Sequence, residues 1–598
     1  MHLIQTTPHF HFMANYSHSH ICQCLSGLLN FRRHFSVIIA EKRHKTGQEL
    51  AEEVLSLAQG LLHLGLTPGQ VVAISAYNSE RYLEWLLAIA FVGGIAAPLN
   101  YRWSFEEARL AINAVNPLML VTDESSYARY SKLQQNDVPS LKWHILLDSP
   151  SSDFTKWNVL TAEMLKRHPV KLLPFDYSWA PEGAVIICFT SGTTGKPKGV
   201  TLSHGALIIQ SLAKIAIVGY NEDDVCHSVL HKAINIKILD LAPLKRASYM
   251  VYLHTAPLFH IGGLSSAMTM LMVGGCHVLM PKFDAESAVD AIEQYAVTSF
   301  ITVPAIMASL ISIIRHKETW QGGDTVKKIL NGGGSLSHEL IKDTSIFFHK
   351  AKLISAYGMT ETCSSLTFLT LYEPMHETTS QSLQAFGVAG SKLIHQQQGV
   401  CVGKAAPHIE LKISADASGH IGRILTRGPH IMLRYWDQTL TNPLNPNNEA
   451  WLDTGDIGSI DHYGNLWLLG RTNGRIKSGG ENIYPEEVEA ILQQHPGIAS
   501  VVVVGIPDAH LTEMVAACIQ LRENWQWSEQ LSASNEEFLL SRKNLHQYCI
   551  ENHLSRFKIP KTFIVWRKPF QLTTTGKIRR DQVRKEVMSQ LQSLHSNL

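Results

Sequence analysis

The sequence has no excess of charge of either sign and no apolar run long enough to cross a membrane. Its 598 residues include 52 Lys and Arg against 51 Asp and Glu, so it lacks the basic field that attracts nucleic acid or anionic membranes. The longest apolar run, Trp85 to Leu99, is interrupted by Gly93 and Gly94 and is shorter than the roughly 20 residues of a membrane-spanning helix. We therefore expect small-molecule partners, no nucleic acid and no membrane span.

The sequence also lacks paired cysteines. None of its nine cysteines stands in C-x-x-C spacing, so neither a zinc site nor a disulfide framework is expected, and a reducing compartment fits.

The first 40 residues contain no Asp or Glu, as in transit peptides, but Arg32 and Arg33 supply their only Lys or Arg charge, which weakens a targeting interpretation. Residues 1–15 are expected to be a disordered extension.

Hydrophobic periodicity predicts alternating helices and strands. From Gln48 to Asn100 a helix is followed by a Gly-Leu-Thr-Pro-Gly turn, a strand at Val71 to Ser75, and a buried helix that leads into a strand. This alternation is typical of α/β domains with parallel sheets covered by helices. Further strands are predicted at residues 184–189, 256–259, 277–280, 299–303, 328–330 and 353–356.

The C-terminal part of the sequence has a different secondary-structure pattern. After about Arg423, short alternating strands and turns follow one another, and a helix at 485–494 precedes a strand at 500–504. These patterns predict an N-terminal α/β domain over residues 16–469 and a small α+β domain over residues 470–598. The polar stretch 375–398 is expected to be a long surface loop.

A loop rich in glycine, hydroxyl groups and lysine follows the strand predicted at 184–189. Its glycines let backbone N–H groups approach an anion, which hydroxyls and two lysines would surround. It lacks the spacing of a Walker loop, and no G-x-G-x-x-G fingerprint follows a strand nearby. We interpret it as a phosphate-binding loop, the alternative being a flexible surface loop. Its residues are Thr190, Ser191, Gly192, Thr193, Thr194, Gly195, Lys196, Pro197, Lys198 and Gly199.

The string TSGTTGKPKGV that begins at Thr190 resembles the phosphate loop of the adenylate-forming superfamily, which includes acyl-CoA ligases, luciferases and peptide-synthetase adenylation domains. Further motifs follow in that superfamily's order between roughly Leu50 and Arg580. The resemblance implies a large N-terminal domain that binds ATP and an acid, and a small mobile C-terminal domain. It also implies two half-reactions at one site, with ATP, Mg²⁺ and coenzyme A required.

Two motifs resemble segments that line the nucleotide site. The turn Asn331 to Ser335, with Gly333 and Gly334, resembles the one beside adenine and the acyl group, and Tyr357-Gly358-Met359-Thr360-Glu361 resembles the segment that stacks on adenine. The resemblance assigns Thr360 to phosphate and Glu361 to Mg²⁺. Stacking of Tyr357 on adenine is chemically reasonable because aromatic faces stack on bases. Binding of Mg²⁺ by Glu361 is reasonable because Mg²⁺ prefers carboxylate oxygens. Alone, Thr-Glu would be a helix cap.

Two further motifs resemble the ribose site and the hinge. Asp456, in the string WLDTGD, corresponds to the residue that accepts both ribose hydroxyls, and Arg471 follows at the superfamily's distance; without that context Asp456 would be an ordinary turn residue. Asn473 aligns with the hinge pivot, where many members carry Asp or Lys, and asparagine readily adopts unusual backbone angles. The resemblance implies coenzyme A binding by Ser478, Gly479 and Gly480.

The segment Thr573 to Lys577 resembles the C-terminal loop whose lysine reaches the α-phosphate and the substrate carboxylate. A lysine in a glycine-containing turn is usually solvated, but the string LSRFKIPK at 554–561 also matches the superfamily. The resemblance therefore makes Lys577 a catalytic candidate, together with Thr360, Glu361 and His260.

His260 is the candidate that bears on the acid. It lies in the string PLFHIGG, where amino-acid-activating members carry an Asp for the substrate ammonium. A simple carboxylic acid is therefore favoured, although His260 could equally be a gate or an ordinary pocket histidine.

Several strings resemble the 2-succinylbenzoate-CoA ligases of naphthoquinone synthesis, particularly the plant, phylloquinone-pathway members. They begin at Lys328, Tyr357 and Ser478. An aromatic dicarboxylic acid is then the implied substrate, and its pocket should be cationic or hydroxyl-rich beside apolar walls. The alternatives are a fatty-acyl or hydroxycinnamoyl-CoA ligase and, in another class, an inactive adenylate-binding scaffold. Pocket candidates are His260, Ser265, Ser335 and residues 362–365.

Two features depart from the family pattern or bear on compartment. Residues 226–251 interrupt the usual run from an acidic turn into the strand before Pro257, and their basic, aperiodic composition suggests a translated intron or a gene-model error. The final Ser596-Asn597-Leu598 resembles the Ser-Lys-Leu peroxisomal address without its central basic residue. A peroxisomal location is expected, with the chloroplast as the alternative.

Overall fold

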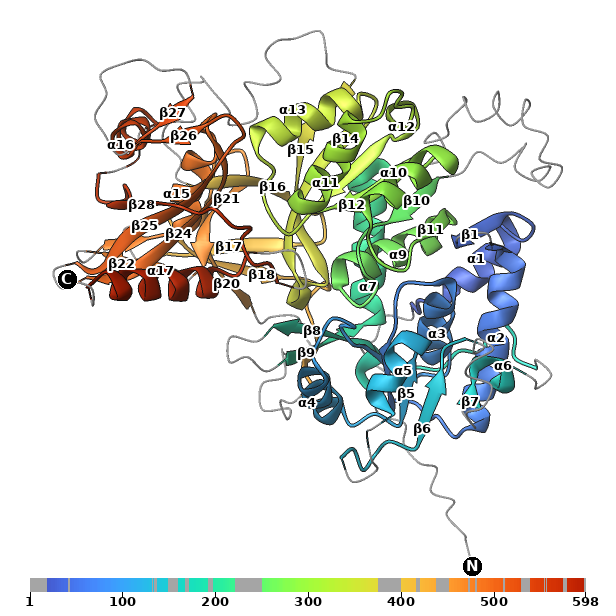
Figure 1. Cartoon of the computed structure of the whole chain (residues 1–598). Helices are drawn as coiled ribbons and strands as arrows, with labels where there is room; N and C mark the ends of the chain where they lie inside the picture. The colour runs from blue at the N-terminus through green and yellow to red at the C-terminus, as the bar shows by residue number, and fades with distance from the viewer. Residues whose placement is uncertain are drawn as a thin grey trace, which may run out of the picture. The chain divides into compact units, whose positions relative to one another are not determined.

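The computed structural model describes the chain (Figure 1) except for residues 1–18, 41–42, 132, 134–136, 149–159, 167–170, 192–196, 221–249, 375–398, 416–419, 437–450, 472–473, 479–480, 509–510, 529–537, 553, 555, 574–577 and 596–598. The expected extension at 1–15, the expected loop at 375–398, the C-terminal tripeptide and nearly all of the segment 226–251 thus lie outside the described residues. Among the residues that are described, no helix is long and apolar enough to cross a membrane.

The chain divides into two units. Unit 1 comprises residues 1–283, 360–364 and 427–450, and unit 2 comprises residues 284–359, 365–426 and 451–598. Parallel sheets layered by helices make this the mixed α/β fold that the sequence predicts. The predicted domain boundary at residue 470 stays a prediction, since this division follows other limits.

An eight-stranded sheet forms the centre of unit 1, in the order β19-β9-β8-β4-β3-β5-β6-β7. Its strands from β8 to β7 are parallel, whereas β9 and β19 add antiparallel pairs. β3 is buried at every residue, as expected for a parallel strand covered on both faces. The strands are β3 (Val71–Ser75), β4 (Ile95–Pro98), β5 (Met119–Thr122), β6 (Trp143–Leu146), β7 (Leu160–Thr161), β8 (Ala184–Ser191), β9 (Pro197–Ser203) and β19 (Arg434–Tyr435).

The helices of unit 1 begin where the sequence provides caps. α2 (Gly47–His63) starts with a capping box, in which the Thr46 side chain accepts from the Glu49 N–H and the Glu49 carboxylate accepts from the Thr46 N–H. α3 (Glu80–Phe91) is capped by Ser79 and leads into β4, which confirms the predicted helix-to-strand transition. The other helices are α1 (Gln23–Phe31), α4 (Phe105–Val115), α5 (Glu124–Tyr130), α6 (Ala162–Leu165), α7 (His204–Lys214) and α9 (Ile261–Val273), with a π-helical turn, η3 (Ile215–Gly219), after α7 and a 3₁₀ turn, η2 (Pro181–Gly183), before β8.

A second group of strands in unit 1 contains β10 (Val251–His254), β11 (Cys276–Leu279), β1 (Ser36–Ala40) and β2 (Arg43–Thr46). β10, β11 and β1 are parallel, and β2 pairs antiparallel with β1. The strand predicted at 256–259 is wrong, because β10 ends at His254. The Asn78 side chain instead binds the backbone there, donating to the Ala256 carbonyl and accepting from the Leu258 N–H. This contact holds the turn that leads into α9.

Unit 2 continues with parallel strands and then antiparallel ones, in the order β17-β18-β20-β21-β16-β15-β14-β13-β12. β12, β13 and β14 are parallel, and the pairs β15–β16, β16–β21, β21–β20 and β20–β18 are antiparallel. The strands are β12 (Ser299–Thr302), β13 (Lys328–Asn331), β14 (Lys352–Met359), β15 (Ser364–Tyr372), β16 (Val400–Ala405), β17 (Glu410–Ser414), β18 (Gly422–Arg427), β20 (Leu452–Ile460) and β21 (Asn465–Arg471); the helices are α10 (Ala285–Gln294), α11 (Pro304–Arg315), α12 (Gly322–Thr325) and α13 (His338–Phe347).

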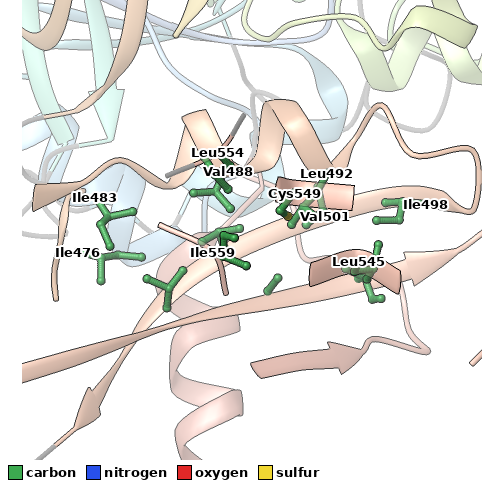
Figure 2. Close-up of a cluster of buried hydrophobic side chains, with 14 of the residues drawn as sticks. Ile476, Ile483, Val488, Leu492, Ile498, Val501, Leu545, Cys549, Leu554 and Ile559 are labelled. Atoms are coloured by element: carbon green, nitrogen blue, oxygen red, sulfur yellow. The ribbon is translucent and has the colours of Figure 1, made fainter. Parts of the chain in front are cut away.

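The C-terminal part of unit 2 has its own sheet, in the order β23-β22-β25-β24 with β28 beside β25. Along β24, Val501 and Val503 belong to one core cluster while Val502 and Val504 belong to another, so the sheet is covered on both faces. Figure 2 shows the first cluster, where Leu492 of α15 lies near Cys549 of α16 and Val488 lies near Leu554. The elements are β22 (Ile476–Ser478), β23 (Glu481–Ile483), α15 (Pro485–Leu492), β24 (Ile498–Asp508), β25 (Thr512–Leu521), β26 (Gln526–Trp527), β27 (Leu539–Leu540), α16 (Arg542–Glu551), β28 (Thr562–Val565) and α17 (Arg580–His595).

Replacing Leu492 by alanine should destabilise this C-terminal core. The side chain is fully buried in the cluster of Figure 2, and its loss leaves a cavity that costs about 2–5 kcal/mol. Urea unfolding followed by circular dichroism measures the change. Leu62→Ala is the control, because that side chain on α2 is 43% exposed and should cost less than about 1 kcal/mol. Equal losses would contradict the assignment of Leu492 to the core.

Candidate functional site

The predicted phosphate loop connects the two strands of a hairpin. Thr190 at the end of β8 pairs with Lys198 of β9, and Ser191 pairs with Pro197. Residues 192–196, which include Gly192, Thr193, Thr194, Gly195 and Lys196, lie outside the described residues. The Lys198 ammonium lies 5.4 Å from the centre of the Tyr435 ring, a cation–π geometry that orients the lysine without neutralising it.

Tyr435 also contacts the predicted magnesium ligand. Its hydroxyl donates a 2.9 Å hydrogen bond to Oε1 of Glu361, whose backbone carbonyl accepts from the Met432 N–H at 2.8 Å. Glu361 and Thr360 are both buried, in the 3₁₀ turn η6 (Thr360–Thr362). One tyrosine therefore links a predicted phosphate-binding lysine with a predicted metal-binding carboxylate. We did not predict Tyr435 as a site residue, because the motifs to which the resemblance assigns a binding or catalytic role do not contain it.

A buried lysine holds the segment that follows Glu361. The Lys214 ammonium donates to Ser265 Oγ at 2.6 Å and to Ser364 Oγ at 3.2 Å, and Gln210 donates to the Thr362 carbonyl at 3.0 Å. Burial lowers the pKa of Lys214 to about 8, against an ordinary 10.5. Lys214 is a second residue that our sequence reasoning missed, because a single lysine in an apolar helix pattern is usually solvated.

The backbone of the same segment is strained. Cys363 and Ser364 have φ angles of 53° and 108°, in the left-handed region that non-glycine residues rarely adopt. Such strain persists only where surrounding contacts hold the chain, and it concentrates at functional sites. The contacts from Lys214 and Gln210 supply that restraint here.

His260 occupies the N-cap of α9. Its Nδ1 accepts a 3.1 Å hydrogen bond from the Gly262 N–H, which fixes the ring orientation. Position 263 requires a glycine, because a Cβ there would lie 2.3 Å from the Pro257 carbonyl oxygen. The string PLFHIGG thus has a local structural explanation, and a role of His260 toward substrate stays a prediction.

Unit 2 brings three predicted nucleotide-binding residues together. The Tyr357 hydroxyl donates to Oδ2 of Asp456 at 2.6 Å, and Arg471 Nε lies 3.0 Å from Oδ1. Asp456 and Arg471 are paired across β20 and β21, so the sheet register sets this ion pair. Asp456 is buried. Removal of the Tyr357 hydroxyl from water, together with the negative charge of Asp456, raises the pKa of Tyr357 above the ordinary range. The phenol therefore stays protonated and remains a donor.

The predicted turn at 331–335 follows β13. Asn331 donates from Nδ2 to the Gly334 carbonyl at 2.7 Å, and Gly333 has a φ of 73°, which explains a glycine at that position. Gly333, Gly334 and Ser335 are exposed, and Gly358 continues β14 directly after Tyr357. Because β13 and β14 are parallel, their carboxyl ends lie at the same sheet edge, where α/β folds usually bind ligands.

The C-terminal candidates are only partly described. Ser478 ends β22 and is buried, whereas Asn473, Gly479, Gly480 and Lys577 lie outside the described residues. Leu572 and Ile578, which flank residues 573–577 in the sequence, form an antiparallel bridge.

The string at 554–561 has a structural role. Lys558 donates to both carboxylate oxygens of Glu487 at 2.8 and 2.9 Å, and both side chains are buried. The pair ties this string to α15.

The predicted site residues thus form two local clusters. Unit 1 joins Lys198 and Glu361 through Tyr435, and unit 2 joins Tyr357, Asp456 and Arg471. Within the described parts of the chain, no group of three or more His, Cys, Asp or Glu could hold a metal by itself. A cavity of about 500 Å³ lined by α1, α7 and α9 contains none of the predicted site residues.

Comparison with known proteins finds two family models that match this chain. Residues 30–436 match the family model described as AMP-binding enzyme, and residues 487–577 match the model described as AMP-binding enzyme C-terminal domain. The chloroplastic/peroxisomal 2-succinylbenzoate–CoA ligase of Arabidopsis thaliana is 52% identical over 98% of this chain and 100% of its own length. The indoleacetate–CoA ligase of Aromatoleum aromaticum is 32% identical over 90% of this chain and 92% of its own.

One solved structure extends the comparison to the fold. The o-succinylbenzoate CoA synthetase of Bacillus subtilis, in complex with its acyl-adenylate intermediate, superimposes with a TM-score of 0.66. The two chains are 24% identical, over 95% of this chain and 98% of that one. At this identity the match shows a shared fold.

The buried ammonium of Lys214 predicts a pH dependence of stability. Because its folded-state pKa is lowered to about 8, the charged lysine disfavours folding at neutral pH, and this cost is relieved as pH rises from 8 toward 10.5. The neighbouring Cys363 thiol, with its pKa raised to about 12 by burial, stays neutral in this range. Relative to Lys214→Met, wild type should gain about 2 kcal/mol of unfolding free energy between about pH 7 and 9.5. Urea unfolding measures it, and parallel pH profiles would contradict a buried lysine.

Proposed function

Because this chain belongs to the family of AMP-binding enzymes, we propose that it is an ATP- and CoA-dependent acid–thiol ligase that converts 2-succinylbenzoate to 2-succinylbenzoyl-CoA through an acyl-adenylate. The observation that carries this proposal is the 52% identity with the Arabidopsis ligase over nearly the full length of both chains. A Bacillus cereus protein of the same name, 28% identical over 88% of this chain, supports it. The reaction would belong to naphthoquinone, and in plants phylloquinone, biosynthesis.

The nucleotide is proposed to be bound by the residues of the two clusters. The loop from Thr190 to Lys198 would bind the phosphates, Tyr357 would stack on adenine and Asp456 would accept the ribose hydroxyls. Oδ2 of Asp456 accepts the hydrogen bond from Tyr357 and Oδ1 forms the ion pair with Arg471. Because a carboxylate oxygen has two acceptor sites, both oxygens can also accept from a ribose. Arg471 and Tyr357 hold that carboxylate in one orientation.

Mg²⁺ is the ion proposed for Glu361. Mg²⁺ usually keeps several waters and binds one or two carboxylates together with substrate phosphates, so a single oriented carboxylate fits it. When bound, the ion would offset charge on the phosphates. The hydrogen bond from Tyr435 orients Glu361, and Thr360 precedes it as a hydroxyl donor to phosphate.

The proposed chemistry needs positioning rather than a protein nucleophile. A carboxylate oxygen of the acid attacks the α-phosphorus, the bond to pyrophosphate breaks, and the acyl-adenylate forms. The CoA thiolate then attacks the acyl carbon, and AMP leaves with the oxygen that came from the acid. Lys577 would stabilise charge in the first step, and rotation at Asn473 would bring Ser478, Gly479 and Gly480 to the second.

A peroxisomal location is proposed, with the chloroplast as the alternative. The support is the chloroplastic/peroxisomal name of the Arabidopsis relative. An inactive scaffold is disfavoured because Lys577, Glu361, Asp456 and Arg471 are all retained. The indoleacetate–CoA ligase relative makes other aromatic acids the relevant competitors within the enzyme class.

Thioester formation tests the substrate. The purified chain should form a CoA thioester with 2-succinylbenzoate and ATP, at a kcat/KM at least about 100-fold above those for indoleacetate, coumarate or fatty acids, since discrimination by a charged group is worth this much. Liquid chromatography with mass detection measures the products. The assay should be run on the full chain and on a form lacking residues 226–251. Absence of 2-succinylbenzoate turnover by both would refute the substrate, and a higher rate with another acid would reassign it.

Lys577→Ala should separate the two half-reactions. Adenylate formation, followed by acid-dependent exchange of labelled pyrophosphate into ATP, is expected to fall by about 100-fold or more, because a charge-stabilising group in the transition state is lost. Thioester formation from supplied acyl-adenylate should stay within about threefold of wild type, because the lysine would not take part in thiolate attack. Equal losses in both assays would contradict the proposal that Lys577 acts only in the first step and that rotation at Asn473 brings other residues to the second.

A further inference from the structure

The strongest unexplained feature of unit 1 is the buried ammonium of Lys214. Its side chain is 1% exposed, and its two hydrogen-bond acceptors are both serine hydroxyls, Ser265 on α9 and Ser364. Within the described residues it forms no ion pair with a carboxylate. A buried charge without an opposite charge is costly, because hydroxyl groups only partly replace its hydration.

The groups next to Lys214 do not supply the missing negative charge. The titratable side chain that interacts electrostatically with Lys214 is Cys363. It is a buried thiol, which behaves as a small apolar group rather than as a counter-ion. The other polar side chains of the α9 turn are hydroxyls that bond to backbone, with Ser266 donating to the Gly262 carbonyl and Thr269 to the Ser265 carbonyl. The surroundings are therefore hydroxyl-rich and carry a net positive charge.

The backbone next to the ammonium is also conformationally strained. Ser364, which accepts from Lys214, has a φ of 108°, and Cys363 before it has a φ of 53°. Only two residues separate Ser364 from Glu361, and Ser265 lies five residues after His260. The lysine thus bridges two segments that the sequence already associates with the acid, and it places a cation among hydroxyl groups there.

We propose that Lys214 is the residue that binds the second carboxylate of the substrate, the one that does not react with ATP. This inference rests on the proposed function, because it presupposes an acid with two carboxylates. Ser265 and Ser364 hold the ammonium in place, and the substrate anion supplies the missing counter-charge as a charge-assisted hydrogen bond. Lys214 is then a specificity residue, which favours aromatic dicarboxylates over monocarboxylic acids of the same shape.

The test compares the diacid with its two monoacid analogues. These are 4-oxo-4-phenylbutanoate, which lacks the ring carboxylate, and 2-butanoylbenzoate, which lacks the chain carboxylate. Whichever monoacid retains the reacting group is the reference substrate. The readout is the ratio of kcat/KM for 2-succinylbenzoate to that for the reference monoacid, which cancels losses shared by both substrates.

Lys214→Met and Lys214→Gln should lower this ratio roughly 10- to 100-fold, the range expected for loss of a hydrogen bond between charged groups. The methionine removes the charge with an apolar chain of similar length, and the glutamine keeps hydrogen bonding to the serines. Lys317→Met is the matched control, because that lysine forms ion pairs with Asp290 and Glu293 in unit 2. Its ratio should equal that of wild type.

Several outcomes would overturn the inference. A ratio unchanged in both Lys214 variants, or a wild type that does not prefer the diacid to the monoacid, would exclude a carboxylate-binding role. Failure of both variants to fold would do the same, because it would make the lysine part of the fold. A wild type that turns over neither the diacid nor a monoacid would instead refute the proposed function, which keeps the two failures distinct.

Discussion

The conformation of the segment Thr360–Ser364 depends on one constraint, the hydrogen bonding that holds it against unit 1. Gln210 and Lys214 of α7 bind the Thr362 carbonyl and the Ser364 hydroxyl, and Met432 and Tyr435 bind Glu361. Without these contacts two consecutive non-glycine residues would not keep positive φ angles. The positions of Thr360 and Glu361, and hence the proposed phosphate and magnesium contacts, follow from this restraint.

Both carboxylates proposed to act at the nucleotide are oriented by a tyrosine hydroxyl. Tyr435 donates to Glu361 in unit 1, and Tyr357 donates to Asp456 in unit 2. The neutral hydroxyl donor fixes the Glu361 carboxylate without cancelling its charge, so that group stays available to a cation. Asp456 is also paired with Arg471 and keeps acceptor sites for a ribose. Lys214 follows the same principle with opposite sign, since serine hydroxyls fix its ammonium and leave its charge to be compensated by a ligand.

Much of the fold could be predicted from local pattern. The helix at α2, the strand at β3 and the transition from α3 to β4 follow from periodicity and caps, which are properties of neighbouring residues. The strand predicted at 256–259 failed because Asn78, far away in sequence, binds that backbone. The string at 554–561 supported catalysis in our reading, whereas the structure gives Lys558 an ion pair with Glu487.

The site was predictable where motifs carry it and not where tertiary packing creates it. Tyr357, Asp456 and Arg471 stand in recognisable strings, and the structure joins them. The motifs to which the resemblance assigns a role contain neither Lys214 nor Tyr435, and the importance of these two residues comes from partners more than 50 residues away in sequence. Burial of a lysine cannot be predicted from its neighbours in the chain.

The acyl-adenylate is the central claim, and oxygen transfer tests it most directly. When 2-succinylbenzoate labelled with ¹⁸O in its carboxylates is converted to the thioester, the AMP released should carry one labelled oxygen, because a carboxylate oxygen becomes bonded to the α-phosphorus and stays there. Mass spectrometry of the nucleotide reads this out. Unlabelled AMP, or label in inorganic phosphate with release of ADP, would contradict the account.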